Sequence, residues 1–316
     1  MRIAIVGAGA MGCVFGGKLA LAGHDVTLVD VRQDHVDRIN ERGLELRAPD
    51  GSKDLVSLVA TTDPSDLDPV DVQIYLCKGF ATAEAAASMA HALTPDGWAV
   101  SVQNGLGNER VLAEVLGAER VVPGTTTVGA VSDEPGTTLM SPGTAEGSSF
   151  THLGSPEGAD DVPPGLVAFA ETLSASGLPA EADPDADAVI WTKLAMAVSM
   201  GPLTGILRRS VQDVVDDVHA LGLWRDMFDE VLAVAAAEGV TLDEDQLRSH
   251  CEATYRSVGH HTTSMAADVV AGRRTEIETM ALEVARRGRE HGIPTPVVET
   301  VGRLVRALEG SYERAL

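Results

Sequence analysis

The sequence is poor in aromatic residues and in cysteine, and each shortage excludes a class of protein. Aromatic residues make up 3% of the 316 residues, so the core must be built mainly from aliphatic side chains. The three cysteines, Cys13, Cys77 and Cys251, have neither paired spacing nor metal-ligand spacing. This pattern is typical of a reducing compartment, so we expect a cytoplasmic protein without a disulfide framework.

Basic residues are also scarce. The chain has 24 Lys and Arg against 47 Asp and Glu, for a formal net charge of −23, and only four of the basic residues are lysines. Such a charge repels nucleic acid and anionic lipid, so we expect neither as a partner. An anionic substrate would need a local cationic pocket. The acidic balance could reflect a salt-adapted host or codon bias.

Long uncharged apolar segments are missing as well. No run of about 20 residues is apolar and free of charge, so we expect no membrane span. The chain opens with MRIAIVGAG, a strand and a turn, without a cationic leader, and we expect no signal peptide.

The first part of the chain alternates strand and helix patterns, which predicts a parallel sheet with crossover helices. A β-branched run at 2–6 precedes a glycine-rich turn, a helix that ends at Gly23 and a strand at 25–30. Further strands are predicted at 70–77, 98–105, 121–131 and 178–182, and further helices near 36–43, 82–92 and 163–176. Residues 132–160 are rich in Gly, Pro, Ser and Thr and are predicted to form hairpins and loops.

The second part is almost entirely helical. It follows an acidic, proline-containing break at 181–188, with helices predicted at 186–207, 221–238, 243–257, 264–271, 275–291 and 295–313. We therefore expect an α/β fold class, with a Rossmann-type dinucleotide-binding domain over 1–182 and an all-helical domain over 183–316. We place a hinge near 180–185. The helical domain could form a homodimer, although no stretch requires it.

The motif GAGAMG predicts a dinucleotide-binding turn. Gly7, Gly9 and Gly12 have the spacing G-x-G-x-x-G, with Ala10 and Met11 between the last two. The first glycine permits a tight turn, the second lets a pyrophosphate approach the backbone, and the third allows close packing of helix and strand. The motif alone is weak evidence, but a strand precedes it and a helix follows. A turn that has lost its ligand is the alternative.

Asp30 ends the second strand, roughly 20 residues beyond the glycines, where an acidic residue binds the ribose hydroxyls of NAD. A carboxylate there repels a 2′-phosphate, so NAD is favoured over NADP. Arg32 lies two residues further on and could still bind that phosphate. The predicted cofactor is therefore NAD or NADP, with NAD preferred.

Six motifs in one order resemble the ketopantoate reductase family over nearly the whole chain: GAGAMG, LCKGF, QNGLGNE, GTTTVGA, WTKL…GPLTG and SMAADVVAGRRTEIE. The family reduces 2-dehydropantoate to pantoate, in pantothenate synthesis, with a nicotinamide cofactor. The resemblance implies a Rossmann domain followed by a helical domain, with the active site in the cleft between them.

The resemblance also implies roles for individual residues. Lys193 matches the catalytic lysine and Glu276 the acidic residue of the site. Lys78 matches a lysine near the cofactor, and Asn104 an asparagine that contacts both cofactor and substrate. Ser264 matches a substrate-binding serine, and Asp268 falls within the SMxxD pattern of the family.

The chemistry of ketone reduction explains a lysine in the apolar stretch WTKLAMAVSM. Hydride that arrives at a ketone carbon leaves negative charge on oxygen, and an ammonium group can stabilise and protonate that alkoxide. Burial lowers the pKa of a lysine, and a carboxylate such as Glu276 raises it. The alternative for Lys193 is an ammonium that extends to solvent from an amphipathic helix.

The other candidates have structural alternatives. Lys78 and Asn104 each follow a strand and could be ordinary loop residues, although both lie at the edge where parallel sheets bind ligands. Ser264 could cap a helix and Glu276 could cap or decorate the next one, while Asp268 is assigned a structural ion pair. Two adjacent histidines, His260 and His261, argue only weakly for a metal, and we predict none.

The sequence departs from the family at the predicted substrate face. The family has asparagines four and eight residues after the catalytic lysine, where this chain has Ala197 and Gly201. No residue of 205–215 supplies a further family asparagine. Each missing hydrogen bond to a buried substrate group costs about 1–3 kcal/mol. We therefore expect either a ketopantoate reductase or a related NAD-dependent 2-hydroxyacid dehydrogenase for a less polar 2-oxo acid.

Two further alternatives belong to other classes. A non-catalytic dinucleotide-binding protein would keep the glycine-rich turn and lose Lys193 and Glu276, which are both present. A β-hydroxyacid dehydrogenase also joins a Rossmann domain to helices around a lysine, but it would lack QNGLGN and SMAADVVAGRRTEIE.

Overall fold

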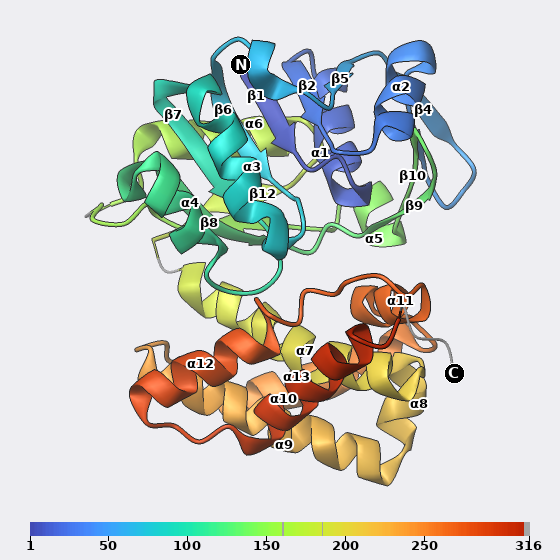
Figure 1. Cartoon of the computed structure of the whole chain (residues 1–316), viewed down its shortest axis with the longest axis vertical. Helices are drawn as coiled ribbons and strands as arrows, with labels where there is room; N and C mark the ends of the chain where they lie inside the picture. Colours follow the sequence, from blue (N-terminus) through green and yellow to red (C-terminus); the bar gives the residue numbers. More distant parts are fainter. Residues whose placement is uncertain (160, 185, 313–316) are drawn as a thin grey trace. The chain divides into compact units, whose positions relative to one another are not determined.

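The computed structural model describes residues 1–159, 161–184 and 186–312, and the chain divides into two compact units (Figure 1). The first unit comprises Met1–Gln103 and Asn108–Ala186. The second comprises Asp187–Leu316 together with the short segment Asn104–Gly107, which lies far from it in sequence. Residue 185, in the predicted hinge, and residue 313, at the end of the last predicted helix, lie outside the described residues.

The first unit is built on an eight-stranded sheet, which confirms the predicted α/β fold. Its order is β12 (Ala180–Ala182), β11 (Thr151–Leu153), β8 (Val121–Thr126), β7 (Leu93–Ser101), β6 (Val70–Tyr75), β1 (Arg2–Val6), β2 (Asp25–Val29) and β5 (Val59–Thr61). All neighbouring strands are parallel except β8 and β11. From β1 the chain adds strands first on one side and then on the other. The order therefore reverses between β1 and β6, where doubly wound sheets bind ligands.

Helices cover both faces of this sheet, because successive strand residues point to opposite faces. Ile3 and Ile5 of β1 belong to a core shared with α1 (Ala10–Leu21), α2 (Gln33–Arg42) and α6 (Pro164–Ala175). Ala4 and Val6 face a second core with α3 (Thr82–Met89) and α4 (Asn108–Leu116), which lie in front of the sheet in Figure 1. Burial on both faces explains why the central strands are nearly continuous apolar runs.

Four short 3₁₀ turns are also present in the described part of the first unit: η1 (Pro64–Asp66), η2 (Gly79–Ala81), η3 (Ala90–Ala92) and η4 (Ala118–Arg120).

A second, four-stranded sheet was not predicted. Its order is β4 (Lys53–Val56), β3 (Leu44–Arg47), β10 (Thr137–Met140) and β9 (Ala130–Glu134). The single strand predicted at 121–131 is therefore wrong beyond Thr126, because β9 belongs to this other sheet. The region predicted as hairpins and loops, 132–160, also contains β11 and the short helix α5 (Pro142–Ala145), and its last residue lies outside the described residues.

The second unit is helical, as predicted. Its helices are α7 (Ala186–Leu207), α8 (Val211–Asp216), α9 (Val218–Ala237), α10 (Glu244–Val258), α11 (Ser264–Val270), α12 (Ala281–His291) and α13 (Pro296–Glu309). Helix α7 supplies Trp191, Leu194 and Val198 to the core that all the longer helices share. By length and composition alone α7 could cross a membrane, but 61% of its most apolar window is buried, as in the core helix of a globular domain.

The helix predicted at 275–291 is wrong in its first six residues. Residues 275–280 form turns, and α12 begins at Ala281. The backbone N–H and the hydroxyl of Thr275 both donate to Glu309 Oε1, at 2.7 and 2.6 Å. These bonds hold the segment against the end of α13 and give its backbone a partner outside a helix. Glu276 therefore lies in a turn rather than on a helix.

Candidate functional site

The glycine-rich turn has the close contacts that its motif predicts. Gly7 has a φ of +99°, and a Cβ built there would lie 2.4 Å from the backbone nitrogen of Cys77. A Cβ on Gly12 would lie 2.1 Å from the carbonyl oxygen of Gly7. Backbone atoms cannot move aside as a flexible side chain can, so both positions require glycine.

Gly9 differs from these two glycines, because a Cβ built there would meet nothing within 4 Å. Gly9 is the N-cap of α1, and its position accepts no side-chain capping bond. The start of α1 therefore has open space beside Gly9 and no side-chain cap. This arrangement fits the pyrophosphate of a dinucleotide.

Asp30 follows β2 and is engaged by Arg32. Its Oδ1 accepts hydrogen bonds from the backbone nitrogen of Arg32 at 3.0 Å and from Nε at 3.1 Å. The same guanidinium donates to the carbonyl oxygen of Ala8 at 3.2 Å, so it reaches the glycine-rich turn. A carboxylate that could accept bonds from ribose hydroxyls and a cation that could bind a phosphate thus lie side by side. Their pairing would weaken the repulsion of a 2′-phosphate by Asp30.

Lys78 follows β6 at the point where the strand order reverses. It is half-buried and is the N-cap of η2. The preceding residue, Cys77, packs against Gly7, and its N–H donates to Val6 O at 3.0 Å. Lys78 is therefore the direct neighbour in sequence of Cys77, the residue that contacts the glycine-rich turn. Both residues belong to the first unit.

Lys193, Asn104 and Glu276 come together in the second unit. Lys193, on α7, is half-buried, and its Nζ donates a 2.9 Å hydrogen bond to Asn104 Oδ1. Burial lowers the pKa of Lys193 to about 8, while the charge of the Glu276 carboxylate opposes this shift. Glu276 is itself buried. This amine can therefore give up or take a proton near neutral pH.

The segment that carries Asn104 packs against the turn that contains Glu276. Leu106 N–H donates to Thr279 O at 2.8 Å, and a Cβ on Gly105 would lie 2.3 Å from the same oxygen. Sequence reasoning missed Thr279, because its backbone carbonyl makes the contact and no side-chain pattern reveals it.

Ser264 is the first residue of α11 and is exposed. It is not the helix cap, since Thr263 holds that position and accepts a bond from Ala266 N–H. Asp268 is buried and pairs with Arg273 at 2.9 Å, which fits its predicted structural role.

The two positions that lack the family asparagines differ from each other. Ala197 is half-buried, one turn from Lys193. Gly201 is buried, and a Cβ there would contact Met265 Cβ of α11 at 3.6 Å. Gly201 therefore packs against α11, whereas Ala197 remains partly accessible.

The two adjacent histidines have no metal-ligand partners among the described residues. His260 Nδ1 is 3.0 Å from the hydroxyl of Ser210, the N-cap of α8, and His261 is exposed. Across residues 1–159, 161–184 and 186–312, no group of three or more His, Cys, Asp or Glu side chains could hold a metal ion.

Comparison with known proteins identifies the family. Residues 3–155 match the family model described as "Ketopantoate reductase PanE/ApbA", and residues 185–309 match "Ketopantoate reductase PanE/ApbA C terminal". The chain belongs to the ketopantoate reductase family. It is therefore an oxidoreductase that acts on a CH–OH group, as the sequence predicts, and the family uses small oxo acid substrates and a nicotinamide dinucleotide.

Several known proteins resemble the chain over nearly its whole length. The 2-dehydropantoate 2-reductase of Halobacterium salinarum is 32% identical, with 97% of this chain and 98% of that protein covered. The enzyme of Archaeoglobus fulgidus is 30% identical, with 98% of each covered. A structure of D-mandelate dehydrogenase with NADH and anilino(oxo)acetate has a TM-score of 0.92 at 28% identity, covering 99% of this chain and 100% of that one.

Proposed function

We propose that the protein reduces a 2-oxo acid to the 2-hydroxy acid, with 2-dehydropantoate as the first candidate substrate. The observation that carries this proposal is the hydrogen bond from Lys193 Nζ to Asn104 Oδ1, at 2.9 Å, by an amine whose pKa burial lowers to about 8. Such an amine carries the proton that an alkoxide needs at neutral pH.

Each residue has a defined part in this reaction. A nicotinamide dinucleotide held at the glycine-rich turn would provide the hydride for the carbonyl carbon. Lys193 stabilises the charge on the carbonyl oxygen and transfers its proton there, leaving a neutral amine. Asn104 orients the ammonium, Glu276 raises its pKa against burial, and Ser264 binds the substrate.

The cofactor is proposed to bind at the glycine-rich turn, with Gly7, Gly9, Ala10, Met11 and Gly12 around the pyrophosphate. Asp30 would accept bonds from the ribose hydroxyls, and Lys78 would contact the cofactor from the end of β6. We propose that NADH is preferred, because Asp30 repels a 2′-phosphate, and that the Arg32 contact with Asp30 keeps the preference modest.

We also propose a cytosolic enzyme, because Cys13, Cys77 and Cys251 are all free thiols.

The pH dependence should follow the protonation of Lys193. The kcat for 2-oxo acid reduction should be constant at lower pH and fall above about pH 8, because the amine then lacks the proton that it donates. The reverse reaction needs the neutral amine as a base, so its kcat should rise through the same range. Measuring kcat against pH in both directions tests this. Reduction that proceeds at full rate well above that pH would exclude Lys193 as the proton donor.

A second candidate is a 2-hydroxyacid dehydrogenase for a bulkier, less polar substrate. It is favoured by Ala197, which cannot hydrogen-bond a substrate where the family has asparagine, and by the likeness to D-mandelate dehydrogenase. The carboxylate and ketone that Lys193 serves are common to both substrates, so the same proton transfer would apply.

A substrate panel distinguishes these candidates. We expect reduction of 2-dehydropantoate and of aryl and branched 2-oxo acids, with the less polar acids within tenfold of 2-dehydropantoate or better in kcat/KM, since one lost hydrogen bond is about a factor of ten. Each acid is assayed with NADH and with NADPH. A wide advantage for 2-dehydropantoate with NADPH would reject both the second candidate and the proposed NADH preference.

A further inference from the structure

The segment Asn104–Gly107 leaves the first unit and returns to it, and its two flanking residues are joined by one side chain. Gln103 Nε2 donates to Thr82 Oγ1 at 2.8 Å, and Thr82 Oγ1 donates to Asn108 Oδ1 at 3.1 Å. All three residues are buried. Gln103 Nε2 also donates to Cys77 O at 2.7 Å. The base of this loop is therefore a closed polar network within the first unit.

The segment Asn104–Gly107 itself belongs to the second unit and makes its contacts there. Gly105 has a φ of +91° and its Cα packs directly on the carbonyl oxygen of Thr279, which also accepts the Leu106 N–H. Gly107 has a similar φ of +83°, but a Cβ there would only touch Glu283 Oε1 at 3.4 Å. The contact at Gly105 is thus backbone on backbone, and the contact at Gly107 is with the end of a side chain.

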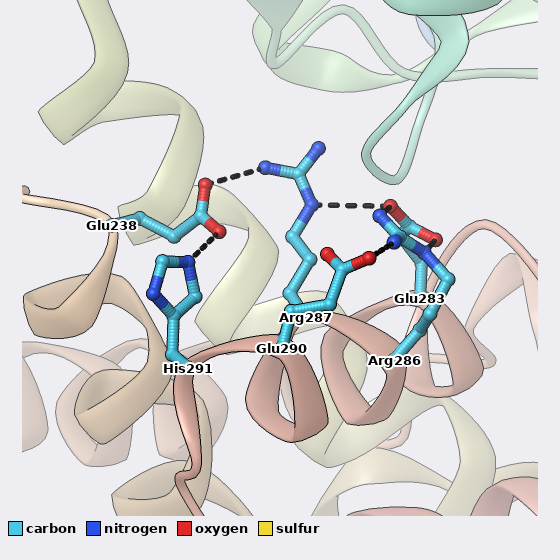
Figure 2. Close-up of polar contacts among 6 residues, drawn as sticks. All are labelled: Glu238, Glu283, Arg286, Arg287, Glu290 and His291. Carbon is cyan, nitrogen blue, oxygen red and sulfur yellow. Dashed lines mark hydrogen bonds and ion pairs between the residues drawn. The ribbon is translucent and has the colours of Figure 1, made fainter.

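Helix α12, which follows the turn that contains Thr279, is tied to the end of α9 by ion pairs (Figure 2). Glu283, in the first turn of α12, accepts bonds from Arg286 at 2.7 Å and from Arg287 at 3.1 Å. Arg287 also pairs at 2.9 Å with Glu238, the C-cap of α9, and His291 lies 2.8 Å from the same carboxylate. This network holds α12 against the end of α9. Residues 276–280 directly precede α12, so their position follows that of the helix.

We propose that Gly105 is a positioning residue, and that the Gly105–Thr279 contact, within the second unit, holds the Asn104 carboxamide on the Lys193 ammonium. The inference rests on the proposed role of Lys193 as proton donor. The lysine ammonium can only donate hydrogen bonds, so the Asn104 carboxamide must turn its Oδ1 atom, not its Nδ2 atom, toward Lys193. The backbone of the segment Asn104–Gly107 sets that orientation. Loss of the Gly105 contact should move Asn104 away from Lys193, while Lys193 stays in place on α7.

The test is Gly105→Ala in the full-length enzyme, with Gly107→Ala as the matched control. Both changes place an L-residue at a positive φ, but only the first forces a backbone atom aside. Gly105→Ala should lower kcat for reduction of 2-dehydropantoate, or of the best acid in the panel, by about 10- to 100-fold, with the NADH dissociation constant nearly unchanged. Without the Asn104 acceptor the ammonium form is less stable, so the alkaline fall in kcat should move about one pH unit lower.

The control and a second variant make the outcome decisive. Gly107→Ala should lose some activity through strain but keep the alkaline fall of the wild type. Asn104→Ala removes the acceptor itself, and it should shift the pH profile in the same direction as Gly105→Ala. Thermal melting and NADH binding confirm that each variant is folded. An unshifted pH profile in folded Gly105→Ala would overturn this inference, whatever Asn104→Ala shows, whereas full activity in Lys193→Ala would overturn the proposed function instead.

Discussion

Lys193→Ala should lower kcat for 2-oxo acid reduction by about 10²- to 10⁴-fold, the usual contribution of a positioned general acid. The variant loses the ammonium that Asn104 Oδ1 accepts at 2.9 Å, so neither the charge nor the proton reaches the alkoxide. NADH binding should persist, because the glycine-rich turn belongs to the other unit. Steady-state kinetics with fluorescence titration of NADH separate the two effects.

Two companion variants sharpen this experiment. Lys193→Arg keeps a positive charge, but guanidinium does not release a proton near neutral pH, so it should recover at most a small part of the lost activity. Lys53→Ala removes a lysine whose side chain is 62% exposed and paired with Glu45, and it should leave kcat unchanged. If Lys193→Ala turned over at more than about a tenth of the wild-type rate, the proton would have to come from another group.

Gly9→Ala should weaken NADH binding by at least about tenfold without destabilising the fold. A methyl group there meets nothing within 4 Å of the protein, but it projects into the space where the pyrophosphate would approach the backbone. The free energy of unfolding should change by less than about 0.5 kcal/mol, as for other substitutions without a steric conflict. NADH titration and denaturant unfolding measure the two quantities on one sample.

Gly7→Ala is the contrasting variant for the same turn. Its methyl group would lie 2.4 Å from Cys77 N at a φ of +99°, so both overpacking and backbone strain oppose folding. We expect a loss of about 2–5 kcal/mol in unfolding free energy. Equal effects of Gly7→Ala and Gly9→Ala on stability would contradict the distinct roles assigned to the two glycines.

The sequence was informative where the interactions are local. Gly7, Gly9, Gly12 and Asp30 could be assigned because strand, turn and helix follow one another within about 30 residues, and the steric need for glycine is a property of the turn itself. The central strands and α7 were predictable because burial on every side leaves long apolar patterns.

The features that were missed depend on distant segments. Strand β3 pairs with β10, which lies about 90 residues further along the chain, and these short strands have no pattern that distinguishes them from loops. Residues 275–280 have a helical pattern, but Thr275 bonds to Glu309 instead. The segment Asn104–Gly107 belongs to the second unit, where Leu106 N–H bonds to the carbonyl oxygen of Thr279. A backbone contact of this kind leaves no motif in the sequence. For Lys193 and Glu276, family resemblance supplied what periodicity could not.

Helix α7 carries Lys193 and also provides a packing surface for α11. Its apolar residues belong to the core of the second unit, and Met265 and Val269 of α11 rest on the bare backbone of Gly201 and Gly205. Substitutions on α11 would therefore change what packs on this part of α7 without touching Asn104 or Glu276, the partners of Lys193. Because the proposed substrate-binding residue Ser264 also lies on α11, a protein engineer could begin a search for new acid preferences by randomising α11 alone.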